Sequence, residues 1–541
     1  MKKILLYISI LIIIISCSSK KEEIAPSENI VVNMGSDPTT IDPTLNDIGV
    51  VSTYILHAFE GLTKTDKNND IIPGIAEKWD VSEDGVTYTF NLRTNAKWSD
   101  GKPVTAYDFQ YSWRRAVNPQ TDASFAYMME IIKNATNIRL GTMDITNLGV
   151  NVIDDYTLKV ELENPSLFFL DFVASTGIFV PLREDIIKEY GDEWTLSPKT
   201  YICNGQYVLK ERVPGEKIVY EENTNYYDKE EIVAKRITFV SDNNVANIID
   251  QIFQNKVYFS ALEPPANELE YLTGKGYIKP NDAIGTIYLE LNITNEGLND
   301  KRVRQALSLA IDRRYIVNNI VRGAQTSAGA FVPPAVKGIK HSFRDESSNF
   351  IELNNYQANI EKAKALMAEA GYSNGQNYPV LTLKVFPGIF YEVGKTIQQM
   401  WKEALNIDIK LEEEEFPATL LALTRKKYQI ARMGWTGDYY DPMTMLDIMV
   451  SYGGVNHSGF SNAQYDNLIL EAKKSHDNNL RMQNMIKAES ILLDEMPIIP
   501  LYYKADSLIV NPNLKGLVLN PLGRHRFNYC SVDIVTNTTA K

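Results

Sequence analysis

The chain has few of the residues from which most catalytic and metal sites are built. Its 541 residues include only 3 cysteines and 5 histidines. Zinc proteases of the H-E-x-x-H type and serine hydrolases with a G-x-S-x-G turn are not expected, because neither pattern occurs. A pair of carboxylates could still catalyse hydrolysis, but 68 Asp and Glu residues give no basis for selecting one. We therefore expect a protein that is not an enzyme and that uses no metal and no cofactor.

The chain also lacks an excess of positive charge. Its formal net charge is −13 and its sequence pI is about 5.1. A nucleic-acid partner is not expected, since neutralising phosphates requires a basic surface. The composition is that of an ordinary globular protein, with 44% hydrophobic and 23% charged residues. A chain of this length usually folds as about two or three domains.

Only one long apolar run occurs, and it lies near the beginning of the sequence. Lys2 and Lys3 precede an apolar stretch, residues 4–15, and Cys17 follows. The stretch has the length of a signal peptide, and Cys17 resembles the lipobox cysteine of bacterial lipoproteins. We predict a signal peptide at 1–16 and a lipidated tether at 17–29, which would give membrane contact through lipid on Cys17. The alternative is an uncleaved N-terminal membrane anchor.

The hydrophobic patterns predict a mixed α/β chain. Strands are expected where apolar and polar residues alternate, at 87–92, 157–162 and 381–386. Helices are expected where apolar residues recur every three or four positions, at 299–322, 360–370 and 478–495. Two further patterns resemble ligand loops but fail in detail. The stretch 388–396 has the wrong glycine spacing for a phosphate loop and predicts a strand-to-helix turn. The stretch 66–77 lacks the glycine of a calcium loop and predicts a polar hairpin.

The segment ARMGWTGDYYDP, residues 431–442, carries opposite charges six positions apart. Arg432, Gly434, Thr436 and Asp438 share parity, so an extended chain would present all four on one face. Six residues of strand extend about 20 Å, the scale of a short peptide, whose two ends carry opposite charges. A zwitterionic peptide is therefore the ligand that this segment suggests.

Several other motifs, in order and at consistent separations, give the chain a family resemblance. They are FEGL (59–62), PGIAEKW (73–79), LRTNAKWSDGKPVTAYDF (92–109), NGQY (204–207), KRVRQA (301–306), AIDR (310–313) and the 431–442 segment. Together they resemble the family-5 extracytoplasmic solute-binding proteins of ABC importers, most closely the oligopeptide-binding branch, from about residue 30 to 530. The resemblance implies a two-lobed periplasmic-binding-protein fold of the α/β class, with an inserted extra domain and a hinge.

The resemblance also implies how the chain is divided. Lobe one is expected to hold 30–72, 195–290 and 505–541, and the inserted domain 73–194. Lobe two is expected to hold 291–504 and to carry the ligand-anchoring segment. Cys203 and Cys530 remain in the exported part, and the sequence leaves open whether they form a disulfide or stay as free thiols.

The resemblance assigns roles to residues of the 431–442 segment. Asp438 matches the aspartate that pairs with a peptide's ammonium group, Trp435 a pocket tryptophan, and Arg432 an arginine that meets the ligand carboxylate. The backbone around Gly434–Thr436 would add the peptide as a strand, and so would that of Glu60, Gly61 and Leu62. Tyr127 and Tyr502 are further pocket candidates. A histidine of the relatives matches near Phe390, so carboxylate recognition is expected to differ here.

Each assignment has a structural alternative. Asp438 could be a turn residue before the Asp-Pro pair, Arg432 a lobe-to-lobe ion pair, Glu60 part of a structural network, and the tyrosines core residues. At the level of function, we expect a monomeric, lipid-anchored receptor on the extracytoplasmic face that delivers short peptides to a membrane permease. The alternatives are a receptor for a dipeptide, nickel chelate, haem or oligosaccharide, and an enzyme or adhesin using the same fold.

Overall fold

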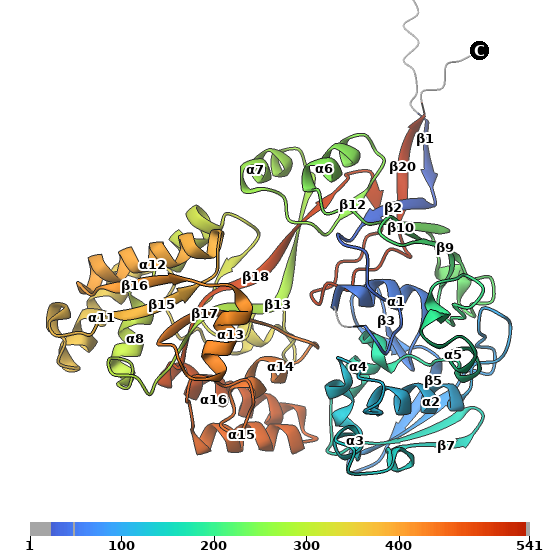
Figure 1. Cartoon of the computed structure of the whole chain (residues 1–541), viewed down its shortest axis with the longest axis horizontal. Helices are drawn as coiled ribbons and strands as arrows, with labels where there is room; N and C mark the ends of the chain where they lie inside the picture. The colour runs from blue at the N-terminus through green and yellow to red at the C-terminus, as the bar shows by residue number, and fades with distance from the viewer. Residues whose placement is uncertain (1–22, 47–48, 537–541) are drawn as a thin grey trace, which may run out of the picture.

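The computed structural model describes residues 23–46 and 49–536 and has two lobes joined by long strands (Figure 1). The predicted signal peptide and Cys17 lie outside the described residues. One mixed sheet of eleven strands runs through both lobes. Its path is β16 (Ile409–Glu413), β15 (Leu381–Val385), β17 (Ile430–Thr436), β13 (Ile278–Leu291), β18 (Ile498–Val510), β12 (Phe259–Ser260), β2 (Asn29–Asn33), β11 (Arg236–Val240), β10 (Lys217–Glu222) and β9 (Tyr207–Val213), with β14 (Thr326–Ser327) beside β18.

Two antiparallel strands, β13 and β18, connect the lobes. Their pairing extends from Ile278 opposite Ile509 to Glu290 opposite Ile498, with register shifts between Asp282 and Thr286 and between Ile287 and Tyr288. The apolar cores fall on either side of these strands. One core takes residues from Ile30 to Phe259 and from Leu508 to Val532, and two others take residues between Ile284 and Tyr502. The strands therefore act as the connection about which the two lobes can move relative to each other.

Residues 73–194 contain a separate four-stranded sheet within the first lobe. It consists of β5 (Ala76–Val81), β6 (Thr87–Leu92), β8 (Thr157–Glu161) and β7 (Val150–Asp154), with α2 (Ala106–Val117) contacting β7. Side chains of this sheet belong to the same apolar core as the rest of the lobe. The division of the chain into three domains stays a prediction.

Strand β1 (Glu23–Ser27) pairs with β20 (Ser531–Thr536) and occupies part of the segment predicted as a tether.

Most of the elements expected from hydrophobic patterns are present. Strand β6 has the predicted bounds, and β8 and β15 end one residue early. Helices α11 (Tyr356–Glu369) and α16 (Asn478–Glu495) are also present. The single helix predicted at 299–322 is wrong. Asp300 caps α8 (Lys301–Leu309), but the Asp312 side chain then accepts the N–H of Tyr315 at 2.9 Å and starts a new helix, α9 (Arg313–Tyr315), followed by a π-helical turn, Ile316–Val321.

Both loop predictions are confirmed. Gly388, at φ +73°, links β15 to α12 (Ile389–Leu405), which makes 388–396 a strand-to-helix turn. Residues 66–70 form the hairpin between β3 (Thr63–Thr65) and β4 (Ile71–Pro73), in which the Asp66 carboxylate accepts the N–H groups of Asn68 and Asp70.

Cys203 and Cys530 are free, buried thiols, and burial raises the pKa of each to about 12.

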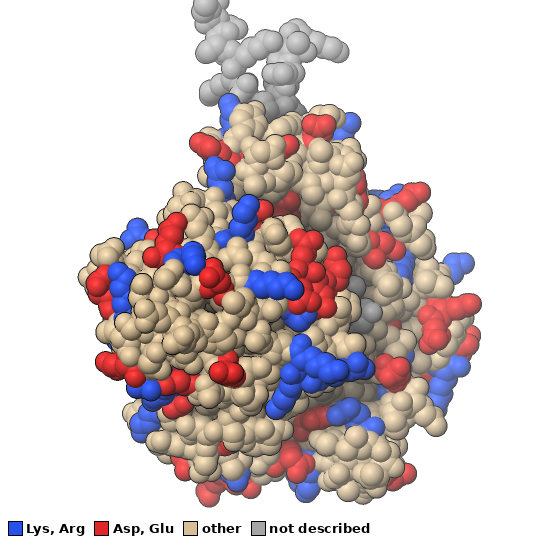
Figure 2. All heavy atoms as spheres, turned by 60° about the vertical axis from the view of Figure 1, so that its left-hand side comes forward, with Lys and Arg blue, Asp and Glu red and all other residues tan. Residues whose placement is uncertain are grey.

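The remaining elements surround these sheets. In the described part of the chain, no helix has both the length and the apolar character to cross a membrane. The other helices and strands are α1 (Ser52–Ala58), α3 (Ala135–Arg139), α4 (Phe169–Ser175), α5 (Glu184–Tyr190), α6 (Val245–Phe253), α7 (Ala266–Gly274), α10 (Phe343–Glu346), α13 (Phe416–Thr424), α14 (Met443–Leu446), α15 (Ala463–Lys474) and β19 (Leu514–Lys515). On the face shown in Figure 2, acidic and basic side chains are interspersed.

Candidate ligand-binding cleft

Strand β17 has an unpaired edge in the second lobe. The N–H of Gly437 donates to the Ile284 carbonyl at 2.7 Å, and the Gln429 carbonyl accepts from Asn292 at 2.9 Å. Because hydrogen bonding alternates along an antiparallel strand, odd-numbered residues of β17 bond to β13, and even-numbered ones direct their backbone groups the other way. On that other side, β15 pairs only with Ile430 and Ala431. Within the described residues, the backbone of 432, 434 and 436 therefore has no strand beside it.

Arg432 lies at one end of this edge, in a cavity of about 630 Å³. Its guanidinium is 5.0 Å from the ring centre of Phe386 and 3.7 Å from that of Phe390, and it donates to the Tyr502 hydroxyl. The side chain is only 8% exposed, and its Nε has no hydrogen-bond partner among the described residues. Burial lowers the pKa of Arg432. A buried guanidinium with an unused donor is suited to a carboxylate.

Asp438 lies beyond the other end of the edge, in a second cavity of about 390 Å³. Tyr127 from the first lobe donates to its carboxylate, and Trp435 lines the same cavity, with its indole N–H donating to the Thr444 carbonyl at 2.7 Å. Burial raises the pKa of Asp438, although Arg524 and the Tyr127 hydrogen bond oppose this. Asp438 forms no ion pair with any residue that the structure describes, so its carboxylate can accept a cation.

The structure thus separates the predicted site residues into groups. Arg432, Gly434, Thr436 and Tyr502 line the larger cavity, and Trp435, Asp438 and Tyr127 line the smaller one. The expectation that Asp438 shares a face with the other three even-numbered residues is wrong, because β17 ends at Thr436 and the chain turns after it. The proposed lobe-to-lobe ion pair of Arg432 is absent from the described residues.

The second predicted backbone segment, Glu60–Leu62, lies apart from these cavities in the first lobe. The hydroxyls of Tyr226 and Tyr227 both donate to the Glu60 carboxylate, and Lys64 lies 3.7 Å away. The Glu60 N–H and carbonyl both bond to the Asn204 amide. The carbonyls of Gly61 and Leu62 accept from the 74–76 backbone. These contacts fit the alternative that Glu60 belongs to a structural network, and ligand contact by 60–62 stays a prediction.

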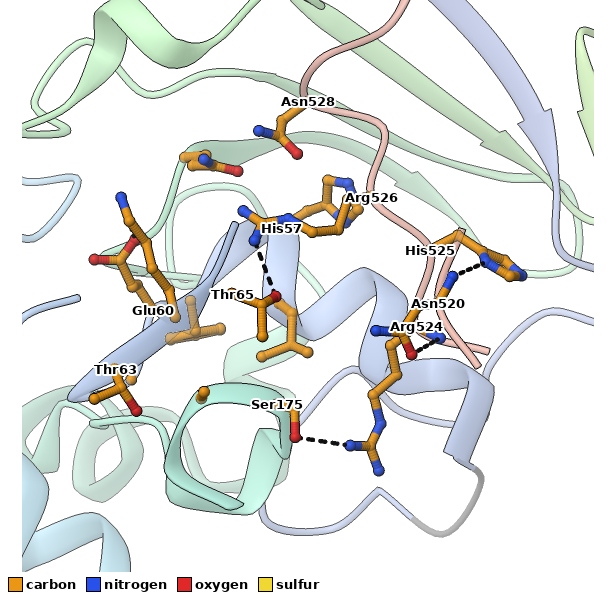
Figure 3. A pocket seen from close by; sticks show the side chains of 16 residues that line it. His57, Glu60, Thr63, Thr65, Ser175, Asn520, Arg524, His525, Arg526 and Asn528 are labelled. Carbon is orange, nitrogen blue, oxygen red and sulfur yellow. Dashed lines mark hydrogen bonds and ion pairs between the residues drawn. The ribbon is translucent and has the colours of Figure 1, made fainter. Parts of the chain in front are cut away.

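Glu60 and Gly61 border a cavity of only about 40 Å³, which is too small for a peptide (Figure 3). Its two histidines, His57 and His525, are neutral near pH 7 because burial lowers the pKa of each to about 4. His57 donates through Nδ1 to the Thr53 carbonyl at 2.6 Å and accepts from the Phe527 N–H at 3.1 Å. Both of its ring nitrogens are therefore occupied, and the contacts of His57 are structural.

Two cations at the cleft are not signalled by local sequence. Arg524, from the C-terminal segment, donates to the Asp438 carbonyl at 3.3 Å and to the Ser175 hydroxyl at 3.2 Å (Figure 3). Lys504, on β18, donates to the Thr436 hydroxyl at 2.6 Å. Both residues come from distant parts of the sequence: the pairing of β13 with β18 brings Lys504 to β17, and the folding back of the C-terminal segment brings Arg524 to the turn that follows β17.

Further contacts join the lobes close to Asp438. The ring of Tyr439 stacks on Phe168 at 4.7 Å between centres and approaches Phe172 at 4.8 Å. An exposed ion pair of 2.8 Å links Lys337 to Asp70. Ring stacking and an exposed ion pair are contacts that can form and break as two lobes change their relative orientation.

Comparison with known proteins places the chain in a family. Residues 70–457 match the profile of the bacterial extracellular solute-binding proteins, family 5. The chain belongs to this family. It is 30% identical to the oligopeptide-binding protein OppA of Bacillus subtilis, over 92% of this chain and 91% of OppA. It is 32% identical to the periplasmic murein peptide-binding protein MppA of Escherichia coli, over 92% of this chain and 91% of MppA. It is also 32% identical to a probable deoxycholate-binding protein of Escherichia coli, YgiS, over 92% of each chain.

Solved structures of MppA show the same two-lobed fold and distinguish the conformation. An unliganded open form aligns with a TM-score of 0.85 at 31% identity, covering 94% of this chain and 98% of that one. Another structure of Escherichia coli MppA gives 0.73 at the same identity and with 94% and 99% coverage. Since sequence identity is the same, the difference in score reflects conformation, and the lobes here are arranged much as in the open form.

Proposed function

We propose that this protein captures short peptides between its lobes and delivers them to the membrane permease of an ABC importer. Asp438 would hold the peptide's ammonium group, Arg432 its carboxylate, and the open edge of β17 its backbone. Trp435, Tyr127 and Tyr502 would line the side-chain pockets. The observation that carries the proposal is an anion and a buried cation, neither in an ion pair with a described residue, near opposite ends of one free strand edge. A peptide satisfies all three features at once by strand addition.

The main chain would provide most of the affinity in this arrangement. Gly434 presents backbone without a side chain at the edge, which lets a ligand backbone approach closely. Ligand side chains would point alternately toward the two cavities, whose volumes of about 630 and 390 Å³ admit many residue types. Contacts to both lobes would favour the closed arrangement over the open one, because Tyr127 belongs to the first lobe and β17 to the second.

A direct test is native mass spectrometry of residues 18–541, purified from cells and measured before and after mild denaturation. The expected result is a set of released peptides a few residues long. A single non-peptide mass, such as a steroid carboxylate, a nickel chelate, haem or an oligosaccharide, would overturn the peptide proposal. Turnover of the released peptides on prolonged incubation would instead identify an enzyme.

The anchor on Cys17 is a separate part of the proposal. Its support is the basic start, the short apolar run and the cysteine that follows it. Cys17→Ser is expected to abolish incorporation of labelled fatty acid and to release the protein from the membrane fraction. Unchanged labelling in this variant would refute lipidation at Cys17. We further propose that the protein acts as a monomer, which light scattering of residues 18–541 would check.

A further inference from the structure

Lys504 reaches the candidate cleft by crossing a neighbouring strand. It projects from β18, which is separated from β17 by β13. Gly285 on β13 lies in its path, because a Cβ there would be 2.7 Å from Lys504 Cδ and 2.8 Å from the Trp435 carbonyl oxygen. The missing side chain at 285 thus leaves room for the Lys504 stem, whose ammonium ends at the Thr436 hydroxyl, 2.6 Å away.

The ammonium group is poorly compensated at that position. Its one hydrogen bond to a described residue goes to a neutral hydroxyl, and it forms no ion pair with the described residues. Burial lowers the pKa of Lys504, and the charge of Arg432 lowers it further, while Asp506 opposes this. The other acid lining the cavity, Glu263, accepts the Ser507 N–H at 3.0 Å, and Asp506 accepts from Asn281 at 3.2 Å. A cation held this way gains from an incoming carboxylate.

The position of Lys504 along β17 identifies the part of the ligand that it would meet. A peptide with its ammonium at Asp438 and its carboxylate toward Arg432 runs antiparallel to β17. Thr436 lies four residues from Arg432, about 13 Å along the strand, and two residues from Asp438, which is at most about 7 Å because the chain turns between them. Directly opposed residues of antiparallel strands place their side chains on the same face. The Lys504 ammonium, on the cavity face at Thr436, is therefore near the second or third ligand residue.

We infer that Lys504 is a specificity-determining residue that binds an acidic side chain at the second or third position of the peptide. The inference rests on the proposed function and adds the ligand class: short peptides with a free ammonium end and an internal carboxylate. Arg432 remains available for the terminal carboxylate, so the two cations serve two different ligand groups. Phe390, stacked on Arg432, supplies no charge to compete with either.

Titration calorimetry of ligand-free protein with matched peptides tests the inference. The pairs are Ala-Glu-Ala-Ala with Ala-Gln-Ala-Ala, and Ala-Ala-Glu-Ala with Ala-Ala-Gln-Ala, which differ only in charge. In at least one pair, wild-type protein should bind the Glu peptide tenfold or more tightly than the Gln peptide. Lys504→Met should reduce this ratio to near one while leaving the affinity for the Gln peptide within about threefold. Lys188→Met, at an exposed lysine on α5, is the matched control and should keep the wild-type ratio.

The possible outcomes separate this inference from the proposed function. Equal affinity of wild-type protein for the Glu and Gln peptides in both pairs would overturn the role of Lys504 without contradicting the proposed capture of peptides. A preference that survives Lys504→Met would assign the acidic subsite to another group and also overturn it. Wild-type protein that binds none of the four peptides, nor peptides released from cells, would overturn both. An unchanged melting temperature for Lys504→Met would show that a lost preference does not arise from misfolding.

Discussion

The charged residues of the second lobe fall into two groups, one paired within the fold and one without an ion-pair partner among the described residues. Asp441 and Arg481 form a buried, two-pronged ion pair with both contacts at 2.6 Å. Asp438, three residues earlier, has no ion pair with a described residue. The same contrast separates Arg344, which pairs with buried Glu489 at 2.7 Å, from Arg432, which faces two aromatic rings and a hydroxyl.

The contrast indicates which charges belong to the fold and which await a ligand. The turn at the Asp-Pro pair is formed by Asp441, whose carboxylate also accepts the Met443 N–H at 2.9 Å. Asp438 is therefore not needed for the role of a turn aspartate. Burying a charge without a partner is costly, so unpaired charges on a cleft are retained where a ligand supplies the missing partner.

Breaking the paired group should give the largest change in stability. Arg481→Met leaves the Asp441 carboxylate buried without its cation, and we expect a loss of about 3–5 kcal/mol in the free energy of unfolding. Urea denaturation followed by circular dichroism measures it. Lys188→Met removes an exposed pair in α5 and should change the same quantity by about 0.5 kcal/mol or less. Equal effects of the two variants would show that the Asp441–Arg481 pair stabilises the fold no more than an exposed pair.

Removing the unpaired anion should affect binding and not stability. For Asp438→Asn, we expect the affinity for peptides with a free amino terminus to fall by about 2 kcal/mol or more, since the ligand ammonium loses its partner. Calorimetry measures the affinity, and the urea midpoint should stay close to that of wild type. N-acetylated peptides provide the control. N-acetylated peptides should bind wild-type protein weakly and should bind the variant with no lower affinity. An equal loss of affinity for both peptide types in the variant would contradict the ammonium role.

The pH dependence of peptide affinity should identify the same pair. Because burial raises the pKa of Asp438, its charge is lost at a higher pH than for an exposed aspartate. Affinity should therefore fall as the solution is acidified through that pKa, and again above about pH 8 as the ligand amino group loses its proton. Asp171, whose pKa burial and the Asp441 charge raise to about 7, also titrates near the lobe contact. The acid limb should disappear in Asp438→Asn and persist in Asp171→Asn; persistence in both variants would argue against Asp438.

The smallest effect on binding is expected at Glu60. Its carboxylate is already held by Tyr226, Tyr227 and Lys64, so Glu60→Gln should change peptide affinity by about twofold or less. The free energy of unfolding should fall by about 1 kcal/mol, because hydrogen bonds to a charged group become bonds to a neutral one. Calorimetry and urea denaturation on the same preparation measure both. A tenfold loss of peptide affinity at an unchanged free energy of unfolding would show that Glu60 contacts the ligand.

The sequence by itself determined the features that depend on neighbours along the chain. The alternation at 87–92 defines β6, Asp300 caps α8, and Gly388 permits the turn into α12, since each needs only local dihedrals and hydrogen bonds. The motifs indicated the family, and the charges at Arg432 and Asp438 suggested a peptide. Local periodicity failed at 299–322, where a second cap at Asp312 interrupts the helix.

The tertiary structure decided which of these residues are free to bind. Only strand pairing shows that β15 stops alongside Ala431 and leaves the rest of β17 open. Only packing shows that Glu60 is bonded to two tyrosines, that Arg432 forms no ion pair with a described residue, and that Lys504 passes over Gly285 to Thr436. These facts depend on contacts between residues far apart in the sequence, which no local pattern encodes. The availability of a charge is therefore a property of the fold, whereas its presence is a property of the sequence.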